Sequence, residues 1–309
     1  MAEIVKYIFS IEFLRTVLRM GTPLLFVSMA AVVGAKADIL CIAYEGMMLC
    51  AALGGVLGSA ATNSLILGAM IGIACGVAIA AIFGYFVLYL NTEPMLIGLA
   101  LNILGSGGTV FVLFMLTGSK ANSLLLHSLV YPTVNIPVLE NIPILGEILS
   151  GHNIMTYLAF VAVFLVNWLI YKTNLGLRIR AVGENPSAAE SVGIKVARTK
   201  MTAVLISGLL AAIGGTFMSM GYISSFTRDM IAGRGFIGMA ALNLGKGNPL
   251  LTMLCALLFG AAEAVGNVGQ SQQLPSQFAS MTPYVATILG LVLMNLKNGN
   301  TKKRKAVRS

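Results

Sequence analysis

The polar centre of the chain carries its own helix start and stop signals. This segment reads Gly183-Glu184-Asn185-Pro186-Ser187-Ala188-Ala189-Glu190-Ser191-Val192-Gly193-Ile194. Asn185 can cap the free N–H groups of a helix that begins at Pro186, because the fixed φ of proline suits the first helical position. Gly193 can supply the left-handed residue that ends the helix. The segment therefore predicts a rigid rod of about one and a half to two turns, roughly 10 Å long.

Basic residues crowd both sides of this helical segment. They are Lys172, Arg178 and Arg180 before it and Lys195, Arg198 and Lys200 after it. Because the cytoplasmic loops of membrane proteins carry the excess of lysine and arginine, residues 172–200 are predicted to lie in the cytoplasm. A rigid stub there suits the docking of a partner protein, although an ordinary capped turn in a loop carries the same signals.

The composition of the whole chain is that of a polytopic integral membrane protein. Of its 309 residues, 57% are hydrophobic and only 10% are charged, whereas about a quarter of a soluble domain is charged. The net charge of +9 gathers around the central segment and in the tail, 298–309, rather than on one face. This pattern marks the cytoplasmic edges of the protein and gives no indication of nucleic-acid binding.

Apolar segments long enough to span a membrane recur along the chain, given that a spanning helix needs about 20 residues. They lie near 21–35, 39–60, 65–90, 95–117, 154–171, 201–222, 231–245, 250–268 and 282–297. Several are short or interrupted by glycine. The sequence therefore predicts one all-α transmembrane domain over 1–309, a bundle of about 8–10 membrane segments, some of them discontinuous.

The segments outside the spans predict which side each end faces. Residues 1–20 lack a cleavable-signal pattern and read as an amphipathic surface helix, while 118–153 reads as an extracytoplasmic loop and 298–309 as a cytoplasmic tail. If residues 1–20 are also cytoplasmic, an odd number of crossings must precede the loop. One of the four segments there would then be discontinuous or re-entrant, and 39–60 is the best candidate because it contains Glu45 among glycines.

Two short motifs echo each other on either side of the central segment. Glu45-Gly46 is followed after four residues by Ala51-Ala52-Leu53, and Arg234-Gly235 is followed after four residues by Ala240-Ala241-Leu242. Transporters built from two related halves show such repeats, with the path between them. Chance similarity between helices rich in alanine and glycine explains the echo equally well.

Catalytic and metal-binding motifs are missing from the sequence. It has no Gly-x-x-x-x-Gly-Lys-Ser/Thr loop for ATP, no nucleophile elbow, and only two widely spaced histidines, so neither an enzyme nor a metal site is predicted. Isolated polar residues at membrane depth remain, and Glu45, Asn102 and Asn243 are the candidates for lining a path for a small polar solute. An ion-coupled secondary transporter is the competing hypothesis, but proton relays usually need several ionisable residues in the spans.

Three stretches together resemble a known family. They are Gly176 to Pro186 with Ala188-Ala189 and Gly193-Ile194, then Glu45-Gly46-Met47-Met48, then Gly233-Arg234-Gly235-Phe236-Ile237 with Ala240-Ala241, Gly245 and Asn248-Pro249. In order and spacing they resemble the permease subunits of ABC importers in the ribose, branched-chain amino acid and nucleoside group. The closest likeness is to the shorter permease of bacterial nucleoside (purine) importers.

The resemblance implies partners and an energy source. It implies a multi-pass protein of the bacterial cell membrane that pairs with a second permease in a heterodimer, with ATP-Mg bound in a cytoplasmic ABC ATPase and substrate delivered by an extracytoplasmic binding lipoprotein. The ATPase would grip the coupling segment, whose residues are Gly183, Glu184, Asn185, Pro186, Ser187, Ala188, Ala189 and Gly193. The sequence departs from the family at Cys41-Ile42-Ala43 and Gly245-Lys246-Gly247, so nucleosides are the first expectation and simple sugars the alternative.

Overall fold

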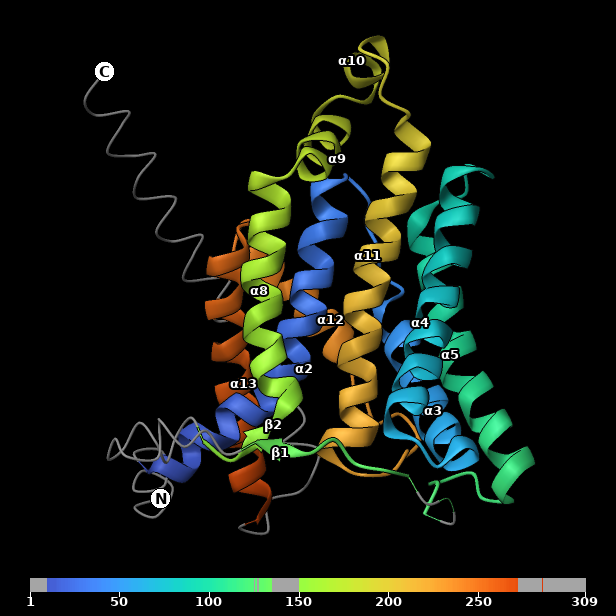
Figure 1. Cartoon of the computed structure of the whole chain (residues 1–309), viewed down its shortest axis with the longest axis vertical. Coiled ribbons are helices and arrows are strands. Elements are labelled where there is room, and N and C mark those ends of the chain that lie inside the picture. Colours follow the sequence, from blue (N-terminus) through green and yellow to red (C-terminus); the bar gives the residue numbers. More distant parts are fainter. Residues whose placement is uncertain (1–9, 125, 127, 135–149, 272–284, 286–309) are drawn as a thin grey trace.

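Long helices that stand side by side make up the computed structural model of the chain, which describes residues 10–124, 126, 128–134, 150–271 and 285 (Figure 1). Within these residues, seven helices are long and apolar enough to span a membrane. They are α2 (Ile11–Lys36), α3 (Tyr44–Thr62), α4 (Leu65–Leu88), α5 (Pro94–Thr117), α8 (Ile154–Lys172), α11 (Val196–Phe217) and α13 (Pro249–Ser271). The predicted span at 282–297 lies almost entirely outside the described residues.

Shorter elements occupy the two ends of the bundle and the break before α13. They are α9 (Asn174–Glu184), α10 (Pro186–Ser191), a π-helical turn η1 (Met218–Tyr222), α12 (Arg234–Leu244), and the paired strands β1 (Thr133–Val134) and β2 (His152–Asn153). Figure 1 shows α10 at one end, hereafter the α10 end, and β1 and β2 at the other, hereafter the β end. Helix α12, which covers much of the predicted span 231–245, has only 11 residues and does not cross by itself.

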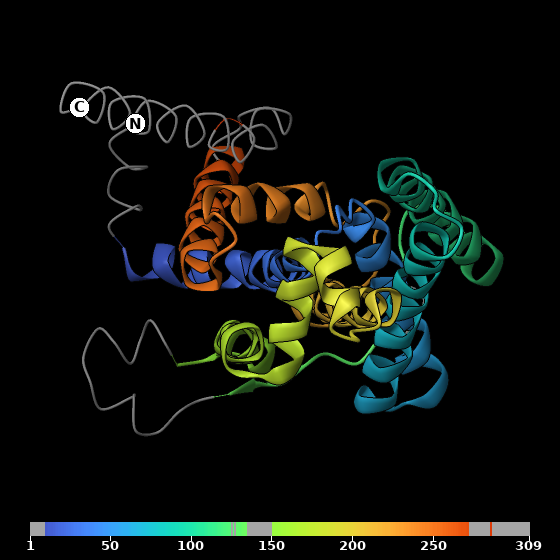
Figure 2. The ribbon, with the colours of Figure 1, turned by 90° about the horizontal axis from the view of Figure 1, so that it is seen from above.

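Helix α2 lies at the centre of the bundle and is buried along most of its length. It packs against α8, α11, α12 and α13 but makes no substantial contact with α3, α4 or α5, and Figure 2 shows α4 and α5 on the far side of α11. Helices α4, α5 and α8 instead expose large apolar side chains such as Ile66, Ile103 and Phe164. An outward apolar face of this kind is stable in lipid.

The first turns of α2 lie at the β end, opposite the central segment, so the condition that the two share one side does not hold for residues 11–20. Arg15 Nη2 donates a hydrogen bond of 2.9 Å to the carbonyl of Ser150, and Arg19 Nη2 donates one of 2.8 Å to the carbonyl of Tyr222. Arg15 and Arg19 therefore bind backbone carbonyls at the β end, and their positive charges do not indicate that residues 11–20 lie at the α10 end. Residues 11–20 are also continuous with α2 instead of forming a separate helix that ends at 20.

The first four spanning segments all cross the bundle, the second of them as residues 37–43 together with α3, so none of them is re-entrant. Residues 37–43 are irregular and lead back into the bundle, where the Tyr44 hydroxyl donates to the Ala30 carbonyl at 3.3 Å. Helix α3 then continues to the β end, where Ser59 Oγ lies 3.3 Å from Ser128 Oγ. The crossing at 39–60 is therefore discontinuous but complete, and the count of crossings before the loop is even.

Candidate functional site

Helices α3 and α12 both begin inside the bundle, and Glu45 joins their first turns. Its Oε1 accepts a hydrogen bond of 2.7 Å from the backbone N–H of Gly233, and its Oε2 accepts one of 2.9 Å from Gly235. The residue before α12 is Gly233, which has φ +81° and no side chain to cap the helix. Glu45 supplies this cap from another helix, and the carboxylate is stabilised by the positive end of the α12 dipole.

Asn102, on α5, holds the start of α3 in place. Its Oδ1 accepts a hydrogen bond of 2.8 Å from the Gly46 N–H, and its Nδ2 donates one of 2.9 Å to the Ile42 carbonyl. The two helices approach closely here, because a Cβ on Gly105 would lie only 2.6 Å from the Gly46 Cα. The structure thus brings Asn102 next to Glu45, and both side chains are engaged with backbone at the broken start of a helix.

A buried ion pair ties α12 to α13. Arg234 Nη2 lies 2.8 Å from Glu263 Oε1, and the side chains are only 11% and 13% exposed. Arg234 Nη1 also donates to the carbonyls of Met230 and Ile231 at 3.2 and 3.1 Å. This geometry makes Glu263 a residue that pairs two helices, because a buried charge needs a partner.

A second polar group lies further along α5. Ser106 Oγ donates a hydrogen bond of 2.7 Å to Asp229 Oδ1, and Arg228 Nε lies 3.3 Å from Asp229 Oδ2. Arg228 and Asp229 are neighbours in the chain and form a local, exposed pair. Ser106 was missed, although it follows Asn102 by one helical turn, and such i, i+4 spacing places both on one face of α5. We call Glu45, Asn102, Ser106, Arg228 and Asp229 the polar stripe.

Asn243 lies away from the polar stripe, at the other end of α12. It is exposed and lines a pocket of about 230 Å³ together with Asp38, Cys41 and Tyr44. Since nine residues separate Asn243 from Arg234, it is displaced by roughly 13 Å along the helix. The predicted path residues therefore divide into two places, with Glu45 and Asn102 inside the bundle and Asn243 near the α10 end.

The central segment forms the capped helix that its sequence predicts. Asn185 Oδ1 accepts a hydrogen bond of 3.0 Å from the Ala188 N–H, and Pro186 is the first residue of α10. Gly193 has φ +83°, and its N–H donates to the Glu190 carbonyl at 2.9 Å. The rod is thus capped at both ends by local hydrogen bonds.

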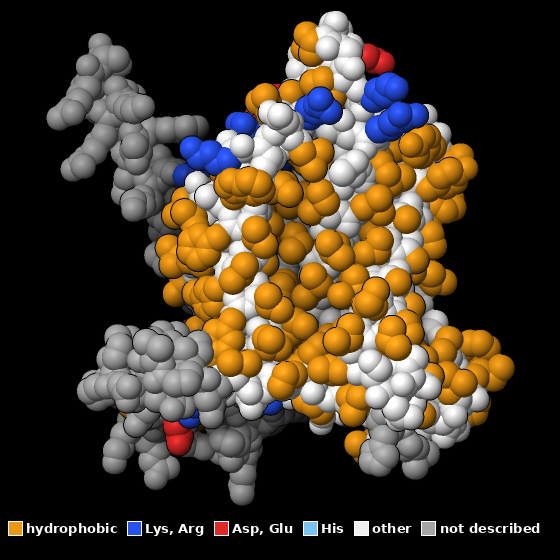
Figure 3. Space-filling view, in the orientation of Figure 1, with side chains coloured by type: hydrophobic (Ala, Val, Ile, Leu, Met, Phe, Trp, Pro, Cys, Tyr) orange, Lys and Arg blue, Asp and Glu red, His pale blue; other side chains and the backbone are white. Residues whose placement is uncertain are grey.

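Helix α10 projects beyond the rest of the bundle on a platform formed by α9. Ile179 and Val182 are the buried face of α9, and a Cβ on Gly183 would collide with the Lys36 carbonyl at the end of α2. Of α10 itself only Ala189 is buried, and the other residues are exposed. Figure 3 shows this tip above a belt of lysine and arginine side chains, with a largely apolar surface below the belt.

Comparison with known proteins places this architecture in a family. The family described as "Branched-chain amino acid transport system / permease component" matches residues 13–296 of the chain. The nucleoside ABC transporter permease protein NupC of Lactococcus lactis is 32% identical over 284 residues, which are 88% of this chain and 89% of NupC. The guanosine ABC transporter permease protein NupQ of Bacillus subtilis is 33% identical over 285 residues, 88% of each chain.

Two further similarities are to a permease named for glucose and to a solved structure of low sequence identity. The putative glucose ABC transporter permease protein TsgC13 of Haloferax volcanii is 32% identical over 275 residues, 86% of this chain and 80% of TsgC13. Among solved structures, PsaBC from Streptococcus pneumoniae in complex with Fab matches with a TM-score of 0.52 at 13% identity, over 94% of each chain, which shows a shared fold. The chain belongs to the family of branched-chain amino acid transport system permease components and is a multi-pass permease component of an ABC transporter.

Proposed function

We propose that this permease imports nucleosides across a bacterial cell membrane, as one half of a heterodimeric path. The observation that carries the substrate class is the identity of about a third, over 88% of the chain, with permeases named for nucleoside and guanosine transport. Simple sugars are the second candidate, supported by the similarity to a putative glucose permease.

The polar stripe supports transport of a neutral polar solute. Glu45 is bound to two backbone N–H groups, and Asp229 is bound to Arg228 and Ser106, so each carboxylate already has donors. A charged solute would have to compete with these bonds. A neutral solute rich in hydroxyl and ring-nitrogen groups can instead use the hydrogen-bonding capacity that remains on Asn102, Ser106 and Asp229.

The exposed rod α10 is proposed as the contact with a cytoplasmic ABC ATPase that binds ATP-Mg. The segment from Gly183 to Gly193, which contains α10, is locally capped and protrudes from the α10 end. A part that transmits motion from a separate subunit must protrude in this way. On this proposal the α10 end is cytoplasmic, and the tail 298–309 is expected on the same side because of its basic residues. The β end then faces outward, where a binding lipoprotein would deliver the solute.

The experiment that tests the proposal is uptake by proteoliposomes that contain this chain with its partner permease, ATPase and binding protein. ATP inside the vesicles should drive uptake of labelled guanosine, and unlabelled nucleosides should compete while pentoses and glucose should not. Competition by glucose alone would assign the path to sugars. Uptake by this chain alone, driven by a proton or sodium gradient without ATP, would refute the importer.

A further inference from the structure

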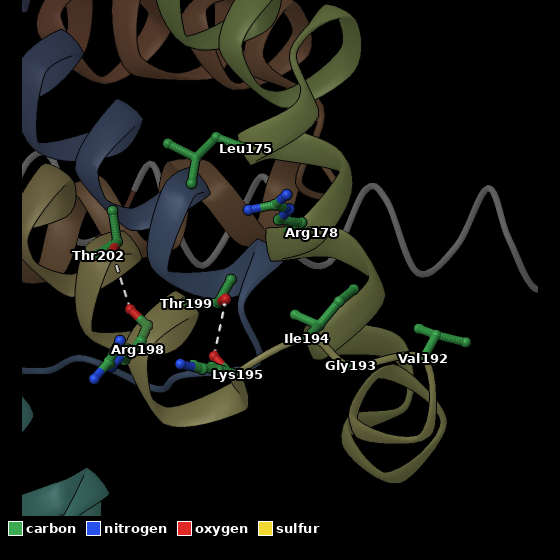
Figure 4. A pocket seen from close by; sticks show the side chains of 9 residues that line it. All are labelled: Leu175, Arg178, Val192, Gly193, Ile194, Lys195, Arg198, Thr199 and Thr202. Carbon is green, nitrogen blue, oxygen red and sulfur yellow. Dashed lines mark hydrogen bonds between the residues drawn. The ribbon is translucent and has the colours of Figure 1, made fainter.

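A basic pocket lies between α9 and the start of α11, beside the linker that follows α10 (Figure 4). Its volume is about 440 Å³, within the range of roughly 300–1,000 Å³ that is usual for small-ligand sites. Arg178 lines it from α9, and Lys195, Arg198, Thr199 and Thr202 line it from the start of α11. No acidic side chain lines it.

No described acidic side chain forms an ion pair with the cations of this basic pocket, although Glu190 borders the neighbouring hollow together with Lys195 and Arg198. Among the described residues the only ion pairs are Arg228–Asp229 and Arg234–Glu263, so Arg178, Lys195 and Arg198 form none. The hydroxyls of Thr199 and Thr202 donate to the carbonyls of Lys195 and Arg198, which leaves the cations as the side-chain donors (Figure 4). Lys195 precedes α11, and its side chain does not cap the first backbone N–H groups of this helix. The positive end of the α11 dipole therefore adds to the attraction for an anion.

The position of the basic pocket favours a lipid as the source of that anion. The belt of lysine and arginine around the α10 end lies directly above the apolar surface that suits lipid tails (Figure 3). Beneath it, α8 exposes Trp168 and Tyr171 near its end, and such aromatic residues gather at the level of lipid headgroups. Leu175 adds an apolar side chain to the lining. Basic pockets at this level of a membrane protein bind anionic headgroups.

We propose that the basic pocket binds the phosphate of an anionic phospholipid in the leaflet at the α10 end. Arginine suits the role because its planar fork can bind a phosphate through two parallel hydrogen bonds. The lipid would lie against α9 and α11, the two helices that flank α10. It would therefore brace the base of α10 in a way that depends on membrane composition and not on the transported solute.

Native mass spectrometry of the full-length chain, with the subunits that purify with it, tests this proposal. The protein is exchanged into detergent with phosphatidylglycerol or phosphatidylcholine, and retained lipids are counted. In phosphatidylglycerol the wild type should retain one more lipid molecule per protein than it retains in phosphatidylcholine. Arg178→Gln should reduce that occupancy by about tenfold, the effect expected for loss of one charge-assisted contact, and Arg178→Lys should retain most of it.

Lys200→Gln is the matched control, because Lys200 lines a neighbouring hollow that Lys195 and Arg198 also border but does not line the basic pocket. It should leave the bound phosphatidylglycerol in place. The proposal is overturned if phosphatidylcholine is retained equally, or if Arg178→Gln and Lys200→Gln lose the lipid alike. It is also overturned if excess inorganic phosphate displaces the lipid completely, which indicates a site for a free anion, or if the added ATPase displaces it, which indicates a protein occupant.

Discussion

At the scale of single residues, the polar side chains inside the bundle act mainly on backbone. Glu45 caps α12 and Asn102 bridges the break before α3, so each satisfies N–H or carbonyl groups that a broken helix leaves open. In a membrane such groups cannot turn to water, and leaving them open costs several kcal/mol. These residues are consequently needed for the fold whatever they do for the solute.

Glu45→Gln should destabilise the protein by about 1–2 kcal/mol, because a neutral amide has only one acceptor oxygen for two N–H groups and loses the attraction to the helix dipole. Thermal unfolding in detergent measures this effect. Glu93→Gln is the control, since Glu93 is exposed and makes no side-chain cap. Equal unfolding midpoints for the two variants would contradict the capping role.

Asn102→Leu and Ser106→Ala should separate folding from transport. Asn102→Leu leaves the Gly46 N–H and the Ile42 carbonyl without partners, which should cost about 2–4 kcal/mol. Ser106→Ala removes one bond to an exposed carboxylate and should change stability by less than about 1 kcal/mol. If the polar stripe lines the path, Ser106→Ala should nevertheless raise the KM for guanosine uptake, and an unchanged KM would remove Ser106 from the path.

At the scale of elements, short helices are the parts whose positions depend most on single contacts. Helix α12 has 11 residues and is held by Glu45 at its start and by the Arg234–Glu263 pair to α13. Helix α10 has six residues and packs mainly against α9 and α11. Helix α12 is fixed inside the bundle, whereas α10 exposes most of its surface and is accessible to a partner protein.

Glu263→Leu should destabilise the protein by about 3–5 kcal/mol, because it leaves Arg234 charged and buried without a partner. The double variant Arg234→Met/Glu263→Leu should recover most of this loss, since two apolar side chains of similar size replace the pair. Thermal unfolding of these two variants and of the single variant Arg234→Met measures the coupling. A double variant as unstable as the sum of the single changes would show that the pair does not act as a unit.

Ala188→Trp should abolish co-purification with the ATPase while leaving the membrane bundle folded, because Ala188 is exposed on the protruding face of α10. Leu250→Trp is the control, because it introduces the same side chain at an exposed position near the α10 end, on α13. Affinity purification from membranes that contain all subunits measures the effect. Retention of the ATPase by Ala188→Trp would place the coupling contact elsewhere.

At the scale of the whole molecule, two discontinuous crossings enclose the polar stripe. One consists of residues 37–43 with α3, and the other consists of residues 223–233 with α12. The sequence echo between Glu45-Gly46 and Arg234-Gly235 marks the starts of these two helices, and Glu45 joins them directly. An even number of crossings then separates the start of α2 from the loop that begins at 118.

The crossing count predicts opposite labelling of the two ends. In a cysteine-free background, Glu12→Cys should react with an impermeant maleimide from the side of the β end, and Ser187→Cys should react only from the other side. Both positions are exposed. Labelling of intact cells and of inverted vesicles distinguishes the sides, and reaction of both cysteines from one side would contradict the topology.

The parts that the sequence could predict depend on local physics. Continuous apolar length predicts the seven long helices, although it also marks 231–245, where α12 does not cross by itself. The capping of α10 follows from Asn185, Pro186 and Gly193 within one short stretch. The sidedness of residues 11–20 could not be predicted, because Arg15 and Arg19 bind carbonyls of residues more than 130 positions away. The role of Ser106 could not be predicted for a similar reason, since its partner Asp229 is 123 residues away in the sequence.

The sequence by itself determined the membrane class, the spanning helices and the exposed capped rod between residues 183 and 193, because each depends on composition or on neighbours along the chain. Only the tertiary structure decided what Glu45, Asn102 and Glu263 do, and that Asn243 lies apart from them. Their roles depend on the approach of helices distant in sequence, which brings a carboxylate to the open end of another helix. Inside the membrane, open backbone N–H and carbonyl groups must bind groups of the protein itself, and the packing of the helices determines which side chain lies close enough to do so.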